Sequence, residues 1–211
     1  MLILCSFFYS VLPASVIADG VSIISCHGND HDTSGLMYFH GLDPKKPSIH
    51  ERFNRKELAL LSKRKKMKLV ILRSNYLCKN ERNCWPMESA STLKRVYSEA
   101  MQASANCLKN TQNITAIGFS NGGYFLSKLV QWCLPNTFDR IIAVGSAGSF
   151  RKHEKKLLST CGLLELFVGK KDITYKKARV YEQELRKRKA DVIFKAFEGR
   201  HELPRLDIIF P

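Results

Sequence analysis

Seven short apolar segments, separated by longer stretches of helical character, limit this chain to few folds. The segments have the length of strands and span residues 21–26, 36–39, 68–72, 114–119, 141–144, 163–168 and 192–197. Residues 69–72 and 141–144 are apolar at every position, which predicts strands covered on both faces, as in a parallel sheet. Helical spacing of apolar residues recurs in residues 49–65, 89–109, 121–133 and 175–189. The alternation predicts a three-layer α/β sandwich around a mostly parallel sheet of about seven strands.

The connection between the first two segments predicts how the sheet begins. Residues 28–35 are rich in Gly, Asn, Asp and Ser, and are too few to hold the crossover helix that parallel strands need. We therefore expect the two segments to form an antiparallel hairpin at the N-terminal edge. A chain of 211 residues with 45% hydrophobic and 25% charged residues is typical of one compact globular domain and excludes a disordered or collagen-like protein.

Residues 1–18 have the character of a leader. They contain no charged residue and end with Val16-Ile17-Ala18 before Asp19, although no Lys or Arg stands near Met1. This pattern predicts a signal peptide at 1–18, a single domain at 19–211, and a secreted or periplasmic location. The alternative is a buried N-terminal helix. A membrane-spanning helix is disfavoured because serines and a proline interrupt a stretch that needs about 20 apolar residues.

The cysteines also indicate an oxidising compartment. Of seven in the chain, Cys5 falls in the predicted leader, which leaves Cys26, Cys78, Cys84, Cys107, Cys133 and Cys161. This even set predicts up to three disulfides. Cys78 and Cys84 are close enough in sequence to close a short loop, and the other pairings stay open. Zinc is the competing interpretation, but no CxxC pair or histidine at ligand spacing accompanies them, so we expect no metal and no other cofactor.

The strongest local motif is Gly118-Phe119-Ser120-Asn121-Gly122-Gly123, which fits GxSxG. It follows an expected strand and precedes an expected helix. A serine forced into such a sharp turn presents its oxygen away from the sheet, and Gly118 and Gly122 give the turn steric room. The alternative is a glycine-rich helix start that only caps or binds phosphate, but no GKS or GKT sequence supports phosphate binding.

With this motif in place, the chain resembles the α/β-hydrolase family over essentially its whole mature length. The family places an acid after a later strand and a histidine after the last strand, and Asp172 and His201 occupy those positions after Ser120 in the same order. An early His-Gly turn corresponds to His40-Gly41-Leu42. The resemblance implies an α/β-hydrolase sandwich with a Ser-His-Asp triad.

The resemblance also implies a mechanism. Ser120 would attack an acyl carbon while His201 takes its proton, and Asp172 would orient the imidazole. The amides of Leu42 and Asn121 would form the oxyanion hole. We expect His40 to order the oxyanion turn rather than to transfer protons.

Alternatives to these assignments remain. Asp172 alone would also suit a helix cap, and His201 a solvated loop residue. Asp191 and Glu202 are weaker candidates for the acid, since Asp191 precedes its strand and Glu202 adjoins the histidine itself.

The sequence indicates an open site for small or polymeric esters. Residues 150–160 leave no room for a large lid between two expected strands. Trp85, in a loop after another strand, is either a substrate platform or a core-packed aromatic. The leader, cysteines and small size resemble secreted polyhydroxybutyrate depolymerases and feruloyl esterases.

Charge suggests a rival function. The chain has 34 Lys+Arg and 19 Asp+Glu, a formal charge of +15, with basic clusters such as residues 63–66 and 186–189. A nucleic-acid or polyanion binder, or a catalytically inactive hydrolase fold that only binds, is the alternative to an enzyme. The clusters are scattered and no base-reading motif accompanies them, so we expect no specific nucleic acid partner. Weak electrostatic association with anionic surfaces is expected instead.

Overall fold

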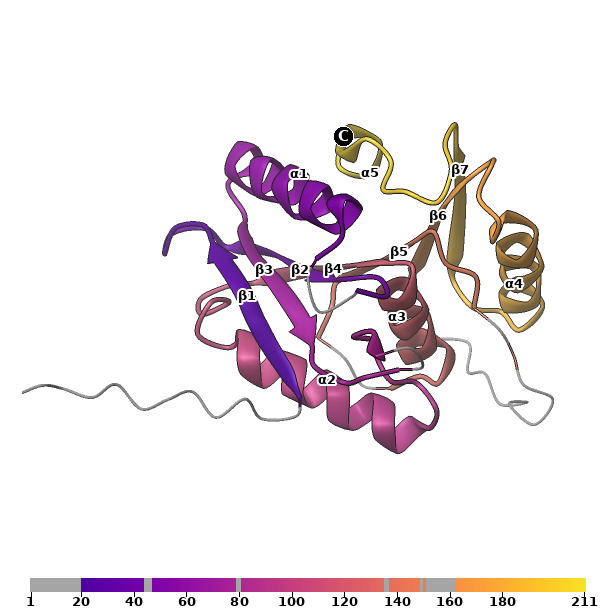
Figure 1. The fold of residues 1–211 in the computed structure, drawn as a ribbon, viewed down its shortest axis with the longest axis horizontal. Helices are drawn as coiled ribbons and strands as arrows, with labels where there is room; N and C mark the ends of the chain where they lie inside the picture. The colour runs from indigo at the N-terminus through magenta and orange to yellow at the C-terminus, as the bar shows by residue number, and fades with distance from the viewer. Residues whose placement is uncertain (1–19, 44–46, 79–80, 135–136, 149, 151–161) are drawn as a thin grey trace, which may run out of the picture.

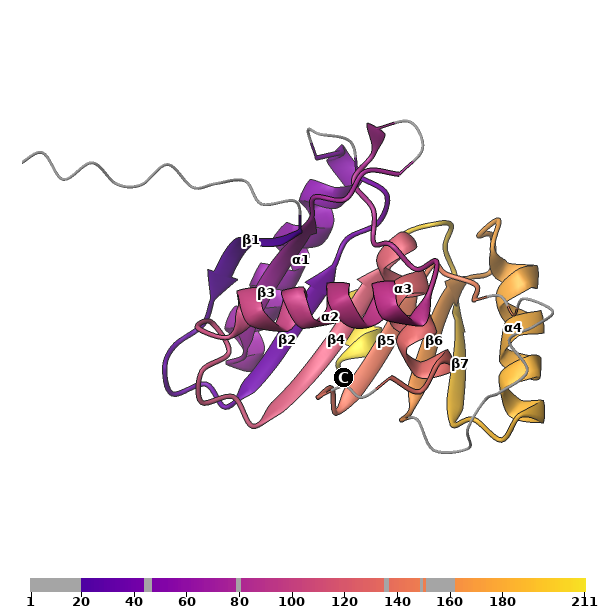
Figure 2. The ribbon, with the colours of Figure 1, turned by 90° about the horizontal axis from the view of Figure 1, so that it is seen from below.

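The computed structural model describes residues 20–43, 47–78, 81–134, 137–148, 150 and 162–211 (Figure 1). Seven strands form one sheet in the order β1-β3-β2-β4-β5-β6-β7 (Figure 2). The strands are β1 (Val21–His27), β2 (Ser34–Phe39), β3 (Lys68–Ser74), β4 (Asn113–Phe119), β5 (Arg140–Val144), β6 (Leu164–Gly169) and β7 (Val192–Phe197). The helices are α1 (Ile49–Lys65), α2 (Ala90–Ser104), α3 (Asn121–Gln131), α4 (Tyr175–Lys187) and α5 (Leu206–Ile209). The predicted leader and most of the segment in which a lid was excluded lie outside the described residues.

The sheet is mostly parallel, as predicted. β2 pairs in parallel with β3 and β4, and the parallel ladder continues from β4 through β5 and β6 to β7. β1 is the one antiparallel strand of this sheet, at the N-terminal edge. Since the carboxyl ends of all parallel strands meet at one edge, the loops that follow β2, β4, β6 and β7 gather there.

The edge hairpin was predicted with the wrong partner. β1 pairs with β3, where Val21 lies opposite Ser74, and β3 separates β1 from β2. Stepping over one strand takes about 10 Å, because neighbouring strands are about 4.8 Å apart. Residues 28–33 can span about 20 Å when extended. The connection is too short for a helix but long enough to cross β3 and join β1 to β2.

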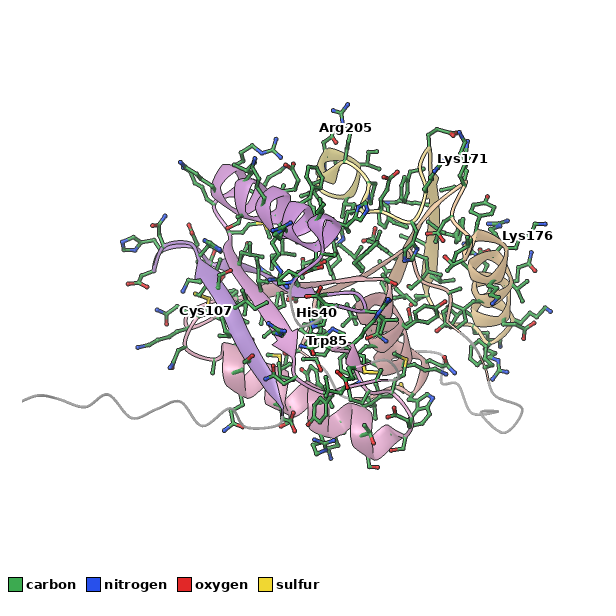
Figure 3. The ribbon with its side chains drawn as sticks, viewed as in Figure 1. His40, Trp85, Cys107, Lys171, Lys176 and Arg205 are labelled. Atoms are coloured by element: carbon green, nitrogen blue, oxygen red, sulfur yellow. A yellow bond between two sulfur atoms is a disulfide. The ribbon has the colours of Figure 1, made fainter. Side chains whose placement is uncertain are left out.

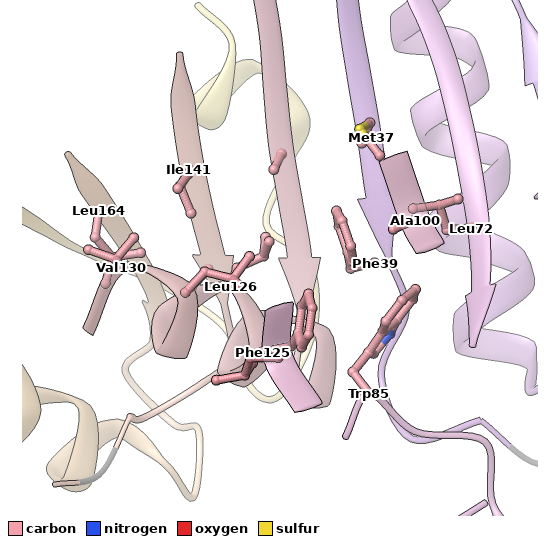
Figure 4. Packing of buried hydrophobic residues seen from close by; sticks show 14 of the residues in the cluster. Met37, Phe39, Leu72, Trp85, Ala100, Phe125, Leu126, Val130, Ile141 and Leu164 are labelled. Carbon is pink, nitrogen blue, oxygen red and sulfur yellow. The ribbon is translucent and has the colours of Figure 1, made fainter. Parts of the chain in front are cut away.

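Alternate residues of the central strands build two separate cores. Leu36 and Tyr38 face a cluster to which α1 and α5 contribute. Met37 and Phe39 face the other cluster, which includes residues of α2, α3 and α4 (Figure 4). Figure 1 shows α1 and α5 on one side of the sheet and α2 and α3 on the other. Burial on both faces explains the uninterrupted apolar segments of the sequence.

The C-terminal segment is anchored to the fold. The Arg140 guanidinium donates to the Ile209 carbonyl at 2.9 Å, and the Lys65 ammonium donates to the Pro211 carbonyl at 2.7 Å. Leu206 and Ile209 are buried in the core under α1. The loop that carries His201 is therefore held at both ends, by β7 before it and by α5 after it.

Two disulfides join described residues. Cys78 pairs with Cys84, which confirms the predicted local loop, and Cys26 of β1 pairs with Cys107 beyond α2. Cys133 is also disulfide-bonded, and Cys161 lies outside the described residues. None of the helices in the described ranges has the length and apolar character needed to cross a bilayer.

Candidate active site

Ser120 lies in a strained turn between β4 and α3. Its backbone has φ 50° and ψ −113°, outside the regions that residues with a Cβ usually adopt. A Cβ on Gly118 would lie 2.4 Å from the carbonyl oxygen of Gly122, and a Cβ on Gly122 would lie 2.2 Å from that of Phe39. The turn predicted from GxSxG is present. Any side chain at either glycine would clash with backbone atoms, and no side-chain movement could relieve the clash.

Ser120, His201 and Asp172 form a continuous hydrogen-bonded chain. His201 Nε2 lies 2.9 Å from Ser120 Oγ, and His201 Nδ1 lies 2.9 Å from Asp172 Oδ2. The Asp172 side chain is fully buried, and its second oxygen accepts from the Thr174 amide at 2.7 Å and hydroxyl at 2.8 Å. Because the carboxylate holds the Nδ1 proton, Nε2 is left to accept the proton of Ser120.

Close contact between two loops brings the acid to the histidine. The loop after β6 bonds to the loop after β7 through Lys171 N and Gly199 O at 2.9 Å. A Cβ on Gly169 would lie 2.4 Å from the Arg200 carbonyl oxygen, so the loops approach to a distance that glycine alone allows. Asp172 and His201 therefore meet although 29 positions separate them in the chain.

The weaker acid candidates lie elsewhere. Asp191 is exposed and directly precedes β7, at the opposite end of the strand from His201. Glu202 is exposed, and its carboxylate accepts from the amide of Arg200 at 3.0 Å. Among the described residues, Asp172 bonds to His201, whereas the side chains of Asp191 and Glu202 form no hydrogen bond or ion pair with it.

A small pocket opens beside Ser120. Its volume is about 300 Å³. The lining residues come from the loop after β2, the start of α1, the 81–84 segment and the two sides of the hydrogen-bonded chain: Gly41, Leu42, Ser48, His50, Glu51, Arg82, Phe119, Ser120 and His201. In the described part of the chain, the amides of Leu42 and Asn121 have no protein acceptor. Both remain free to bind an oxygen atom of a ligand.

Buried His40 orders the turn that carries Leu42. Its Nε2 accepts from the Ser74 amide at 3.1 Å, so Nδ1 carries the proton and donates to the Gly41 carbonyl. Burial lowers the pKa of His40 to about 4, and the ring is neutral at physiological pH. The His40 carbonyl in turn accepts from the amide of Gly122 at 3.0 Å. This agrees with the ordering role expected for His40.

Trp85 is not a substrate platform. Its side chain is 1% exposed and packs on Phe39, with ring centroids 4.9 Å apart (Figure 4). The indole N–H donates to the His40 carbonyl at 3.0 Å, and the Trp85 amide donates to Asn121 Oδ1 at 2.6 Å. Figure 3 shows Trp85 beside His40. The core-packed interpretation is correct, because the ring fills space under the sheet edge and ties its loop to the Ser120 turn.

A buried polar network behind Leu42 was missed in the sequence. Asp43, next to Leu42, accepts from Arg55 Nη2 at 3.2 Å, and Arg55 Nε donates to Glu51 at 2.8 Å. Glu51 also accepts from the Tyr38 hydroxyl at 2.8 Å. Burial raises the pKa of Glu51. Glu51 and Arg55 are four positions apart on α1, a spacing that is common for exposed ion pairs on helices, and only the tertiary structure shows that this pair faces inward.

Metal ligands do not gather in this site. Across the described ranges, no group of three or more His, Cys, Asp and Glu side chains is placed to hold a metal ion. Cysteines in this part of the chain form disulfides, and the ring nitrogens of His40 and His201 are both engaged within the protein.

Solved esterase structures share this architecture. The chain superposes on a carboxylesterase from Bacillus cereus with a TM-score of 0.64 and 16% identity, over 87% of this chain and 88% of that one. Esterase PE8 gives 0.60 and 14% over 90% and 96%, and a carboxylesterase from Mesorhizobium loti gives 0.56 and 16% over 85% and 90%. No protein-family model and no curated protein matches the sequence. The chain has the α/β-hydrolase fold.

Proposed function

We propose that this protein is a serine hydrolase that cleaves carboxylic esters, with Ser120 as nucleophile, His201 as base and Asp172 as the orienting acid. The hydrogen-bonded chain of these three side chains, with 2.9 Å at each histidine nitrogen, carries the proposal. The likeness in fold to two carboxylesterases and esterase PE8 supports it. A polyanion binder would have no need for this arrangement.

The first half-reaction forms an acyl-serine. Ser120 Oγ attacks the ester carbonyl carbon while His201 Nε2 takes the hydroxyl proton, and Asp172 stabilises the resulting imidazolium. The negative charge moves to the former carbonyl oxygen, which the amides of Leu42 and Asn121 bind. When the intermediate collapses, the C–O bond to the alcohol breaks and His201 returns the proton to the departing alkoxide oxygen.

The second half-reaction releases the acid. His201 removes a proton from water, whose oxygen attacks the acyl carbon of the acyl-serine. Collapse breaks the bond to Ser120 Oγ, and His201 reprotonates the serine. The net reaction consumes one water and yields one alcohol and one carboxylic acid, so no cofactor is needed.

The pocket and the exposure of the site favour small or accessible esters. The space beside Ser120 is about 300 Å³, and the His201 side chain is 37% exposed. We propose a short acyl ester, or one unit of a polymer lying across the surface. We include aromatic esters and polyesters among the proposed substrates, because the sequence resembles feruloyl esterases and polyhydroxybutyrate depolymerases.

We further propose that the protein is exported, with residues 1–18 as its signal peptide. The two disulfides support an oxidising compartment. The formal charge of +15 would hold the enzyme near anionic surfaces by weak, salt-sensitive attraction.

A panel of esters tests the activity. We expect the purified protein to hydrolyse 4-nitrophenyl acetate and butyrate, with rates that fall for long acyl chains because the pocket is small. Ethyl ferulate and a soluble hydroxybutyrate oligomer extend the panel to aromatic and polymeric substrates. Failure to cleave any of them above the rate of the heat-denatured protein would contradict the proposal.

Asp172→Asn is expected to lower kcat about 10⁴-fold, because the amide permits the wrong histidine tautomer. The variant should still fold, since the substitution preserves shape and the Thr174 contacts need an oxygen that Asn retains. Asp191→Asn is the matched control, because Asp191 was the alternative acid and should leave kcat unchanged. An equal loss in both variants would contradict the assigned role of Asp172.

A further inference from the structure

Two pockets meet at Leu42 and Arg82. The pocket of about 300 Å³ that contains Ser120 and His201 is lined by both residues. A second pocket, of about 730 Å³, is lined by the same two residues and so adjoins the first. Its remaining lining residues are Tyr76, Leu77, Cys78, Cys84, Pro86, Glu88, Thr92 and Arg95. A substrate held at Ser120 can therefore extend past Leu42 and Arg82 into the second pocket.

Arg82 is a cation without a carboxylate partner among the described residues. The neighbouring cations differ, since Arg55 is paired with Asp43 and Glu51, and Arg95 is paired with Glu99. Glu51 is the carboxylate that lines the serine pocket, and its two oxygens accept from Arg55 and Tyr38. Glu88 lines the second pocket as well, but no described carboxylate forms an ion pair with Arg82, so the guanidinium at the entrance to the site is available to a ligand.

The backbone that carries Arg82 is fixed with respect to Leu42. The Arg82 carbonyl accepts from the Cys78 amide at 2.9 Å, inside the loop closed by the disulfide of Cys78 with Cys84. Asn83, the next residue, exchanges two backbone hydrogen bonds of 3.1 and 2.8 Å with Asp43. A side chain on a backbone segment held in this way can select ligands, because binding costs little backbone conformational entropy.

We propose that Arg82 binds a negatively charged group of the substrate, so that the enzyme prefers carboxylic esters bearing a second, free carboxylate. This inference rests on the proposed ester hydrolysis and specifies its substrate class. A guanidinium presents paired N–H donors that match the two oxygens of a carboxylate. Arg82 determines specificity and takes no part in bond making or breaking.

The preference is measured with half-esters and diesters. Monoethyl and diethyl esters of succinic, glutaric and adipic acid differ in charge at each chain length, and ethanol release follows their cleavage. We expect the best half-ester to have a higher kcat/KM than its diester. Arg82→Gln should lower kcat/KM for that half-ester about tenfold, mainly through KM, and should change kcat/KM for the diester much less. Arg82→Lys should retain part of the preference.

Arg52→Gln is the matched control for charge. Arg52 is exposed on α1, lines neither pocket, and loses the same charge in the same substitution. If Arg52→Gln weakens half-ester cleavage as much as Arg82→Gln does, the preference comes from the overall positive charge of the protein and the proposal is wrong. An equal effect of Arg82→Gln on half-esters and diesters would also overturn it.

Binding to the Ser120→Ala variant separates this inference from the proposed activity. The uncleaved half-ester and diester are titrated by calorimetry into Ser120→Ala and into Ser120→Ala with Arg82→Gln. Tighter binding of the half-ester, lost with Arg82→Gln, supports the anion site even if the wild-type protein cleaves no ester. Equal binding of both ligands overturns the anion site, even if the wild-type protein is an active esterase.

Discussion

Ser120→Ala is expected to lower kcat for the best ester by about 10⁶-fold. The variant lacks the oxygen that forms the acyl-serine, and His201 has no hydroxyl proton to remove. The fold should not change, because Ala occupies less space than Ser and the Ser120 amide still donates to Val144. Initial rates with 4-nitrophenyl acetate at high enzyme concentration measure the loss over this range.

Ser98→Ala controls for the loss of a hydroxyl group. Ser98 is exposed on α2, outside the residues that line either pocket next to Leu42, and its replacement should leave kcat unchanged. If the Ser120→Ala variant keeps a tenth of the wild-type rate, the hydrolysis seen with the wild-type protein does not use Ser120.

Gly122→Ala is expected to lower the free energy of unfolding by about 3 to 5 kcal/mol. This is more than an extra methyl group in a packed core usually costs. The new Cβ would lie 2.2 Å from the Phe39 carbonyl oxygen and 2.7 Å from the His40 carbonyl oxygen, both backbone atoms of the oxyanion loop. Either α3 or the end of β2 must move. Thermal unfolding should shift down by about 10 °C for a chain of this size.

The same movement should disable the site. Gly122 N donates to the His40 carbonyl, so displacement separates the Ser120 turn from the loop that carries Leu42. We expect loss of ester cleavage even at temperatures where the variant is folded. Ser98→Ala again serves as the control for stability, since Ala favours the helix slightly more than Ser and should change the free energy of unfolding by only about a few tenths of a kcal/mol. A Gly122→Ala variant with unchanged Tm and activity would contradict the geometry of the turn.

Local sequence patterns were enough to predict most of the helices and strands. α1 has the bounds predicted from apolar spacing, and β7 ends where expected. Both were predictable because a helix or strand that buries one face repeats its apolar residues at a regular spacing. No local pattern indicated that β1 pairs with β3, since strand pairing depends on segments that are far apart in the chain. α5 was not predicted because four residues are too few for periodicity to show.

The site was partly predictable for a related reason. Ser120, Asp172 and His201 follow strand ends, and a parallel sheet brings strand ends together wherever they lie in the chain. Trp85 was ambiguous because an aromatic in a loop packs inward or outward according to what surrounds it. The ordering contacts of Asn121 and Asp43 join segments 36 to 40 positions apart, beyond the reach of any local motif.

Covalent labelling of the folded protein tests the central claim most directly. A fluorophosphonate should add one phosphonyl group per chain, and mass spectrometry of the tryptic peptide 110–128 should place it on Ser120 rather than on Ser127, which is buried and donates to the Gly123 carbonyl. Ser120→Ala and the heat-denatured protein should remain unlabelled. An unlabelled wild-type protein, or a label that persists in Ser120→Ala, would contradict a catalytic serine at this turn.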